Sequence, residues 1–243
     1  MTLPEDRPRA VLFDFDHTLF RFDDSIAWLR GALIDTDHHL ADDQIIALYE
    51  RLNSARTWPE VVREWDGCQA SSATHRMAVR SWLTRAGVPA ATAEAMYTRL
   101  IAPRGWAPYP DVAETLTALR ACHIPTGIVS NVGWDIRPIF QHHGLAKAVD
   151  AYVLSCEVGA EKPDVTLFHF ASDCLGCQPE QVLVVGDDPI NDGAATRIGM
   201  RVHLLPSAFR VNHRWLCQVV DLVQPSSNEQ APTQRQALER AAR

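Results

Sequence analysis

The sequence predicts an α/β protein whose parallel-sheet core carries an inserted, all-helical segment. The sheet is predicted because the apolar runs 10–13 and 181–186 each lead directly into acidic residues, and because helices alternate with strands from residue 111 onward. The insertion is predicted because residues 21–102 repeat apolar positions at helical spacing without a convincing strand. With 243 residues and 47% hydrophobic composition, the chain can form one large domain or a core with an insertion.

The first strand is predicted at residues 10–13, where the sequence AVLF precedes Asp14 and Asp16. A short apolar run is typical of a strand buried on both faces, and alternation along it directs both carboxylates to one side at its carboxyl end. Two adjacent carboxylates repel each other and are costly to desolvate. Taken alone, the motif fits a polar turn that starts at Thr18, and it equally fits a metal-assisted site with one carboxylate as nucleophile and the other as acid/base.

Residues 21–102 are predicted to form the helical cap. The sequence Asp23-Asp24-Ser25 favours a helix start, and apolar residues at helical spacing follow it. Further helices are predicted after Asp42-Asp43 and at 59–65, 74–86 and 89–100. The proline-rich segment 103–110 is predicted to be the linker out of the cap. Four tryptophans are expected to pack chiefly in the core of the cap: Trp28, Trp58, Trp65 and Trp82.

The chain after residue 111 is predicted to complete the sheet. Helices are predicted at 112–122, 136–143 and 165–175, and strands at 126–130, 151–155, 181–186 and 201–205. Strands separated by single helices imply right-handed crossovers, and so a Rossmann-like three-layer core with a parallel sheet. We therefore expect the α/β core at 1–20 and 103–224, the helical cap at 21–102 and a flexible tail at 225–243.

The expected ligand site lies at one edge of this sheet. Ligands of open parallel sheets bind beyond the carboxyl ends of the strands. That rule brings together the polar residues that follow the predicted strands, namely Asp14, Asp16, Ser130, Asn131, Asp187 and Asp188.

The overall charge restricts the class of partner. A formal net charge of -7 argues against a protein whose main role is binding nucleic acid or an acidic membrane surface, so we expect a small molecule. The N-terminal sequence MTLPEDRPRA lacks the apolar run of a signal peptide, and no stretch is long and apolar enough to span a bilayer. We therefore expect a cytoplasmic protein; the sequence leaves its oligomeric state open.

Four short motifs fall where strands end or helices begin: DFDHT at 14–18, SN at 130–131, EKP at 161–163 and GDDPIND at 186–192. With these motifs in this order, the chain resembles the haloacid dehalogenase-like hydrolase superfamily, in its branch with a helical cap between the first and second motifs. The resemblance covers roughly residues 8–206. It implies a phosphoryl-transfer site that works with a divalent metal, since added positive charge is needed among several carboxylates.

The resemblance implies a role for each acidic residue. Asp14 is expected to be the nucleophile that forms an aspartyl-phosphate, and Asp16 the acid/base that protonates the leaving oxygen and then activates water. The expected Mg²⁺ ligands are a carboxylate oxygen of Asp14, the backbone carbonyl of Asp16 and the carboxylate of Asp187, and oxygen-only ligation suits this ion. Asp192 and Asp188 are expected to orient metal-bound waters.

The resemblance also implies a set of phosphate-binding groups. Ser130 is expected to donate a hydrogen bond to a phosphoryl oxygen, and Lys162 to neutralise both the phosphate and Asp14. Thr18 and Asn131 are expected to contact the substrate. His17 stands where glycine is common in this superfamily, and we expect it to act through its backbone.

The predicted function is that of a Mg²⁺-dependent phosphatase acting on a small phosphate monoester. A 2-haloacid dehalogenase of the same fold needs no metal and lacks the acid two residues after the nucleophile, so Asp16 opposes that alternative. A phosphomutase would use the same core residues, and it stays open. A non-enzymatic binding relative should have lost at least one residue of the set Asp14, Asp16, Lys162 and Asp187, and this chain has all four. No motif in residues 21–102 identifies the substrate.

Overall fold

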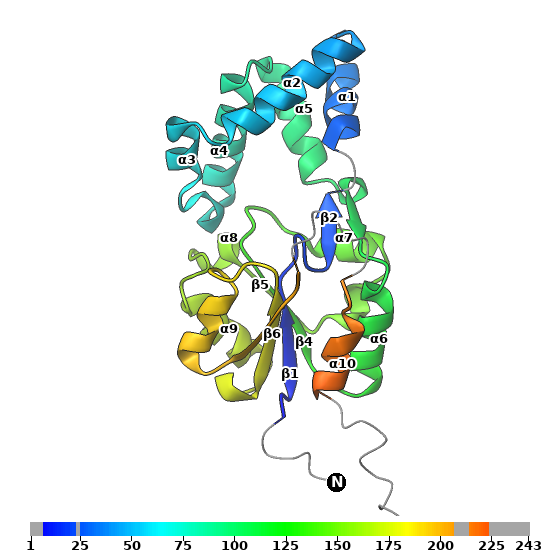
Figure 1. Cartoon of the computed structure of the whole chain (residues 1–243), viewed down its shortest axis with the longest axis vertical. Helices are drawn as coiled ribbons and strands as arrows, with labels where there is room; N and C mark the ends of the chain where they lie inside the picture. The colour runs from blue at the N-terminus through cyan, green and yellow to red at the C-terminus, as the bar shows by residue number, and fades with distance from the viewer. Residues whose placement is uncertain (1–6, 23–24, 207–213, 224–243) are drawn as a thin grey trace, which may run out of the picture.

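The structure, a computed structural model, describes residues 7–22, 25–206 and 214–223. A helical cap lies above an α/β core in the view of Figure 1. The predicted tail at 225–243 lies outside the described residues, as do Asp23 and Asp24 at the predicted start of the cap.

The core is built on a parallel sheet of five strands in the order β5-β4-β1-β6-β7, counted over the described residues. Strand β1 is the central one, because Val11 lies opposite Thr126 of β4 on one side and Leu183 of β6 on the other. All its residues are fully buried, as predicted for a strand covered on both faces. The strand bounds are β1 Ala10–Phe13, β4 Thr126–Ser130, β5 Ala151–Leu154, β6 Val182–Gly186 and β7 Arg201–Leu204.

Helices cover both faces of the sheet, which confirms the predicted three-layer α/β fold. Alternate residues of β1 belong to different cores: Val11 and Phe13 pack with α6, α7 and α10, whereas Ala10 and Leu12 pack with α9. Figure 1 shows α6 and α10 on the opposite side of the sheet from α9. The core helices are α6 Val112–Ala121, α7 Arg137–His142, α8 Ser155–Val158, α9 Thr166–Cys174 and α10 Cys217–Val223.

The cap has a hydrophobic core of its own. Trp82 is almost fully buried there, and the other three tryptophans predicted for the cap core are partly buried against the same cluster. No helix of the described residues is long and apolar enough to cross a membrane. Within the described ranges the cap consists of α1 Ser25–Asp35, α2 Asp42–Ala55, α3 Pro59–Trp65, α4 Ser72–Arg85 and α5 Ala90–Leu100, with a 3₁₀ turn η1 at Cys68–Ala70.

The two connections between core and cap contain strands that the sequence did not predict. Strand β2 (Phe20–Phe22) lies where the predicted cap begins, β3 (Trp106–Pro108) lies in the predicted linker, and the two pair antiparallel as a short ribbon. Each strand has three residues, too few for an alternation pattern to stand out, and the partners are far apart in the sequence.

Hydrogen bonds tie the cap to the core beside the carboxyl edge of the sheet. Ser155, the first residue of α8, donates its hydroxyl to the carbonyl of Gln69 in η1 at 2.7 Å. The backbone N–H of Ala70 donates to a carboxylate oxygen of Glu161, also at 2.7 Å. Glu161 immediately precedes Lys162, so this cap contact adjoins one of the predicted catalytic residues.

An aromatic contact supplements these bonds. His75 of α4 is 1% exposed, and its ring lies 5.3 Å from that of Trp134 in the core. Burial lowers the pKa of His75 to about 4, so its ring is neutral at pH 7. The ring occupies the space that a side chain at Gly133 would need, because a Cβ atom there would lie 2.1 Å from the His75 Cγ.

Gly133→Ala is therefore expected to displace His75 and to destabilise the protein by about 1–3 kcal/mol, the usual cost of overpacking. Chemical denaturation measures this change. In a His75→Ala background the same substitution should cost much less, because the ring that it meets is gone. Equal costs of Gly133→Ala in the two backgrounds would contradict the contact.

Candidate active site

A cavity of about 200 Å³ lies beyond the carboxyl ends of β1, β4 and β6. Its position agrees with the rule for ligand sites in parallel sheets. Apart from Thr18, the structure places every predicted site residue on its wall. The lining residues are Asp14, Asp16, His17, Ser130, Asn131, Lys162, Asp187, Asp188, Asn191 and Asp192.

The turn after β1 keeps Asp14 at the end of the strand and buries Thr18. Asp14 continues the strand, since its N–H donates to Val185 of β6 at 2.9 Å, and its side chain is buried. The chain then turns at His17, which has a φ of 58° in the left-handed region that favours glycine. The His17 N–H closes the turn on the carbonyl of Phe20 at 2.8 Å. The turn directs Thr18 into the core, where it is fully buried and its hydroxyl has no partner among the described residues.

Lys162 joins two carboxylates in the cavity wall. Its buried ammonium donates to Asp14 Oδ1 and to Asp192 Oδ1, both at 2.6 Å, and to the carbonyl of Val129 at 3.1 Å. Burial opposes the charged form of Lys162, but the two carboxylates outweigh it and raise the lysine pKa. Lys162 therefore stays protonated and leaves Asp14 Oδ2 without a contact to it.

Asn131 holds the backbone of Lys162. Its side-chain oxygen accepts from the Lys162 N–H at 2.7 Å, and its side-chain nitrogen donates to the Lys162 carbonyl at 2.8 Å. One N–H of the Asn131 amide remains for a substrate oxygen. Ser130, the last residue of β4, lies beside it with a buried side chain.

Asp192 and Asp188 shape the loop after β6. Asp192 Oδ2 accepts the N–H groups of Asp187 and Asp188 at 3.1 Å each, so both of its oxygens have protein partners. A Cβ at Gly186 would lie 2.1 Å from that oxygen, so this close approach requires glycine. The Asp188 carboxylate accepts from Ile190 N–H at 2.8 Å and from Asn191. These contacts make Asp192 a positioning residue for Lys162 and the loop.

Three carboxylates of the site cluster closely enough to hold a metal ion. One oxygen from each of Asp14, Asp187 and Asp192 lies within 4.8 Å of the others, whereas the Asp16 side chain is not part of this group. When ionised, three carboxylates facing one ammonium leave two negative charges uncompensated. Burial accordingly raises the pKa of Asp14 to about 7 and raises that of Asp187, with the neighbouring carboxylates adding to both shifts. An all-oxygen set with this excess charge fits Mg²⁺.

Asp16 stands apart from the cluster, toward the open side. Its Oδ2 lies 3.8 Å from the His17 ring, and its Oδ1 has no hydrogen-bond partner among the residues that the structure describes. Partial desolvation raises the pKa of Asp16, although His17 and the cap residue Arg56 oppose the rise. A raised pKa favours the protonated form that a general acid needs.

Sequence reasoning missed two residues of this region. Asn191 lines the cavity and donates to Asp188 at 2.8 Å; its place within the motif at 186–192 could have indicated it. Arg56 of the cap lowers the pKa of Asp16 and gave no local signal, because that effect depends on how the cap docks.

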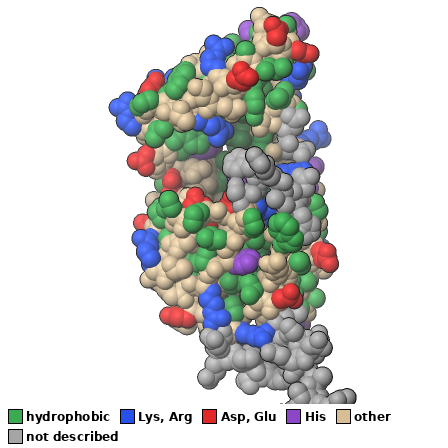
Figure 2. All heavy atoms as spheres, viewed as in Figure 1, with side chains coloured by type: hydrophobic (Ala, Val, Ile, Leu, Met, Phe, Trp, Pro, Cys, Tyr) green, Lys and Arg blue, Asp and Glu red, His purple; other side chains and the backbone are tan. Residues whose placement is uncertain are grey.

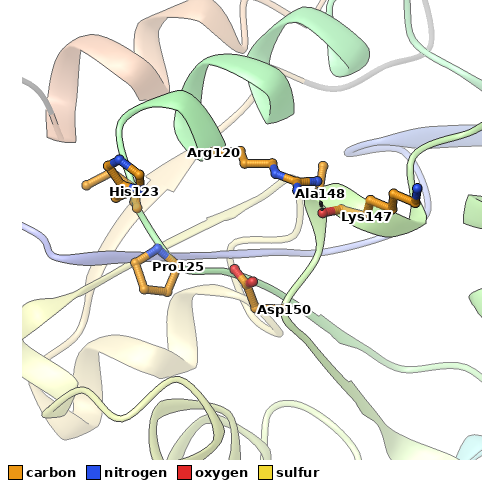
Figure 3. A pocket seen from close by; sticks show the side chains of 7 residues that line it. Arg120, His123, Pro125, Lys147, Ala148 and Asp150 are labelled. Carbon is orange, nitrogen blue, oxygen red and sulfur yellow. Dashed lines mark hydrogen bonds between the residues drawn. The ribbon is translucent and has the colours of Figure 1, made fainter.

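A second cavity, of about 300 Å³, lies at the opposite end of the strands (Figure 3). The Arg120 guanidinium donates to the carbonyl of Lys147 at 2.5 Å, and Asp150 accepts from the Thr126 N–H at 2.8 Å. In Figure 3 the Lys147 ammonium points away from His123 and Asp150. In this second cavity the Arg120 and Asp150 side chains already bind backbone groups, and Lys147 points away from the others. We therefore place the candidate active site at the carboxyl edge of the sheet.

The fold and the acidic cavity together define an α/β protein with its site between a parallel sheet and a helical cap. The family model for haloacid dehalogenase-like hydrolases matches residues 8–199, and the chain belongs to this family of hydrolases. The predicted resemblance is thereby confirmed. A solved structure, a HAD phosphatase from Thermococcus onnurineus, shares the fold with a TM-score of 0.56 at 23% identity, over 81% of this chain and 86% of that one.

Curated relatives carry different activities in their names. The chain is 30% identical to a phosphoglycolate phosphatase of Rhodospirillum rubrum, over 83% of this chain and 81% of the relative. It is 27% identical to haloacid dehalogenase-like hydrolase domain-containing protein 3 of Xenopus laevis, over 46% of this chain and 47% of that protein. It is 33% identical to (S)-2-haloacid dehalogenase 1 of a Pseudomonas species, over 37% of this chain and 40% of that protein. The chain thus spans about half or less of the length of the last two.

Proposed function

We propose that this hydrolase is a Mg²⁺-dependent phosphatase that acts on a small phosphorylated metabolite through an aspartyl-phosphate. The observation that carries the proposal is the arrangement in one cavity of Asp14, of Lys162 at 2.6 Å from it, and of Asp16 with a raised pKa. Asp14 is placed to attack phosphorus, Lys162 to offset negative charge, and Asp16 to protonate the leaving oxygen.

In the first step Asp14 Oδ2 attacks phosphorus, and the bond between phosphorus and the leaving oxygen breaks. Asp16 gives its proton to that oxygen, and the alcohol departs. In the second step Asp16 takes a proton from a water molecule that attacks the phosphorus of the aspartyl-phosphate, which releases inorganic phosphate and restores Asp14. Ser130 donates to a phosphoryl oxygen in both steps. The Lys162 ammonium, whose three N–H groups bind Asp14, Asp192 and Val129, offsets the negative charge beside it.

Asp14, Asp187 and the backbone carbonyl of Asp16 would hold Mg²⁺, which supplies positive charge that offsets the carboxylates and the phosphate. Asp192 is already bound by Lys162 and two N–H groups, so its part is to keep these groups in place.

The alternative function is that of a 2-haloacid dehalogenase, since one of the relatives has that name. Asp16 argues against this alternative. Dehalogenases of this superfamily lack an acid two residues after the nucleophile and need no metal. The phosphoglycolate phosphatase of Rhodospirillum rubrum supports the phosphatase proposal over most of the chain. A phosphomutase would use the same core residues and is separated from a phosphatase by measuring release of inorganic phosphate.

EDTA is expected to silence hydrolysis of p-nitrophenyl phosphate by the purified protein, and Mg²⁺ to restore it, because the carboxylate cluster repels a dianionic substrate without a cation. Ca²⁺ should substitute poorly, since it prefers more ligands at longer distances. Release of phosphate is the measurement. Full activity in EDTA, together with chloride release from a 2-haloacid, would favour the dehalogenase.

A further inference from the structure

The short turn η1 docks an edge of the cap that lies away from the chain connections. The chain enters and leaves the cap at the β2–β3 ribbon, and η1 lies near the middle of the cap sequence. Figure 1 shows α8 beneath α3 and α4, to the left of β2. In the space-filling view of Figure 2, cap and core meet on the left of a hollow. The hydrogen bonds of η1 to Ser155 and Glu161 therefore fasten the cap on the side opposite to its chain connections.

The Ser155 hydroxyl can release the cap without losing its hydrogen bond. Among the described residues, two carbonyl oxygens lie within its reach, that of Gln69 in η1 at 2.7 Å and that of Val132 in the core at 3.1 Å. A hydroxyl has one proton to donate, and the shorter contact joins core to cap. If the cap lifts, the fully buried hydroxyl can turn to Val132, so opening does not leave it unsatisfied.

The Ala70 N–H of η1 has the same choice of partners. It donates to a carboxylate oxygen of Glu161 at 2.7 Å, across the interface, and the carbonyl of Gly67 within the cap lies 3.4 Å away. In both pairs the shorter bond crosses between cap and core and the longer one stays within one part. Contacts of this kind can break and form again at low cost in free energy.

The core partners of η1 belong to the two segments that carry the predicted phosphate-binding groups. The Val132 N–H donates to Ser155 Oγ at 2.9 Å, and Val132 directly follows Asn131. Glu161 directly precedes Lys162. The Asn131 amide joins the two segments, since it binds the N–H and the carbonyl of Lys162. Hydrogen bonds thus run from the cap through both segments to the lysine of the active site.

We propose that Ser155 and Glu161 form a latch that docks the cap over the active site and positions the two segments that carry Asn131 and Lys162. Both are positioning residues, because they act through the backbone of these segments. The latch itself goes beyond the proposed function, and its effect on turnover rests on that function.

Hydrogen exchange of the Ala70 N–H tests the latch without any substrate. In Glu161→Ala this exchange should be about 10- to 100-fold faster, the usual effect of losing a hydrogen bond to a charged group. Glu161→Gln keeps an oxygen acceptor and should restore most of the protection. Ser155→Ala should also speed exchange at Ala70, although Ser155 is bonded to Gln69 instead, because the cap then undocks more often. The amides of α2 should exchange as in the wild type.

Turnover of p-nitrophenyl phosphate in Mg²⁺ tests the positioning. In Glu161→Ala kcat should fall about 10-fold and KM should change less, because the latch orients Lys162 without touching the ester. Glu161→Gln should recover most of kcat. Glu157→Ala is the matched control, since Glu157 lies on α8 near Ser155 and binds Arg137 of the core at 2.6 Å. It should keep both the exchange rate at Ala70 and kcat.

The outcomes separate the latch from the proposed function. An unchanged kcat in folded Glu161→Ala would overturn the positioning, whether or not Ser155→Ala folds. Unchanged exchange at Ala70 in folded Ser155→Ala would mean that the two hydrogen bonds are separate structural contacts, and would overturn the latch. No turnover of p-nitrophenyl phosphate by the wild type would overturn the proposed function and the positioning with it, while hydrogen exchange would still decide the latch.

Discussion

Asp14→Asn is expected to abolish turnover of every phosphate ester, by at least about 10³-fold, while leaving the fold intact. An amide is a poor nucleophile, so the first step loses its attacking atom. The fold should survive because the substituted residue can still accept from Lys162, and because Lys162 keeps its 2.6 Å contact to Asp192. Neutralising one of three clustered carboxylates also relieves repulsion at the site.

The measurement is the steady-state rate in Mg²⁺, with the thermal unfolding midpoint as the test of folding. Asp164→Asn provides a matched control, since Asp164 is an exposed acid two residues after Lys162 whose oxygen caps Thr166 at 2.9 Å. It should keep its activity. More than a few per cent of activity in pure Asp14→Asn would remove Asp14 from the role of nucleophile.

Local sequence patterns predicted the centre of the fold well. The apolar run at 10–13 became the buried central strand, because only a strand covered on both faces accommodates such a run before two acids. Ligands of parallel sheets bind beyond the carboxyl ends of the strands, and this rule correctly predicted that Asp14, Ser130 and Asp187 line one cavity, because parallel strands end at the same edge. These predictions depend on backbone geometry alone.

Predictions that depend on side-chain partners were weaker. The contact of Asn131 with the substrate stays a prediction; the structure adds that both ends of its amide hold the backbone of Lys162, which the sequence did not indicate. Thr18 was predicted to do so as well, but the turn at His17 buries it away from the cavity. Arg56 could not be predicted, because its position depends on tertiary packing of the cap and leaves no local pattern.

Asp16→Asn is expected to slow the reaction in a way that depends on the leaving group. If Asp16 donates a proton to the departing oxygen, its loss matters most when that oxygen is strongly basic, as in an alkyl phosphate. It matters least for p-nitrophenyl phosphate, whose phenolate leaves unaided. General acid catalysis is worth about 10² to 10⁴ in rate, so the difference is measurable. The raised pKa of Asp16 agrees with a group that is protonated when substrate binds.

Single-turnover kinetics of Asp16→Asn separate its two roles. Formation of the aspartyl-phosphate should fall steeply for the alkyl substrate and only mildly for the aryl one. Breakdown should be slow for both, since the same residue must then activate water, and the aryl substrate should show a burst of nitrophenol. Equal losses of the formation step for the two substrates would mean that Asp16 only shapes the metal site. The proton donor would then have to be sought in the cap, because the remaining acids of the cavity cluster with Lys162 or hold their own loop.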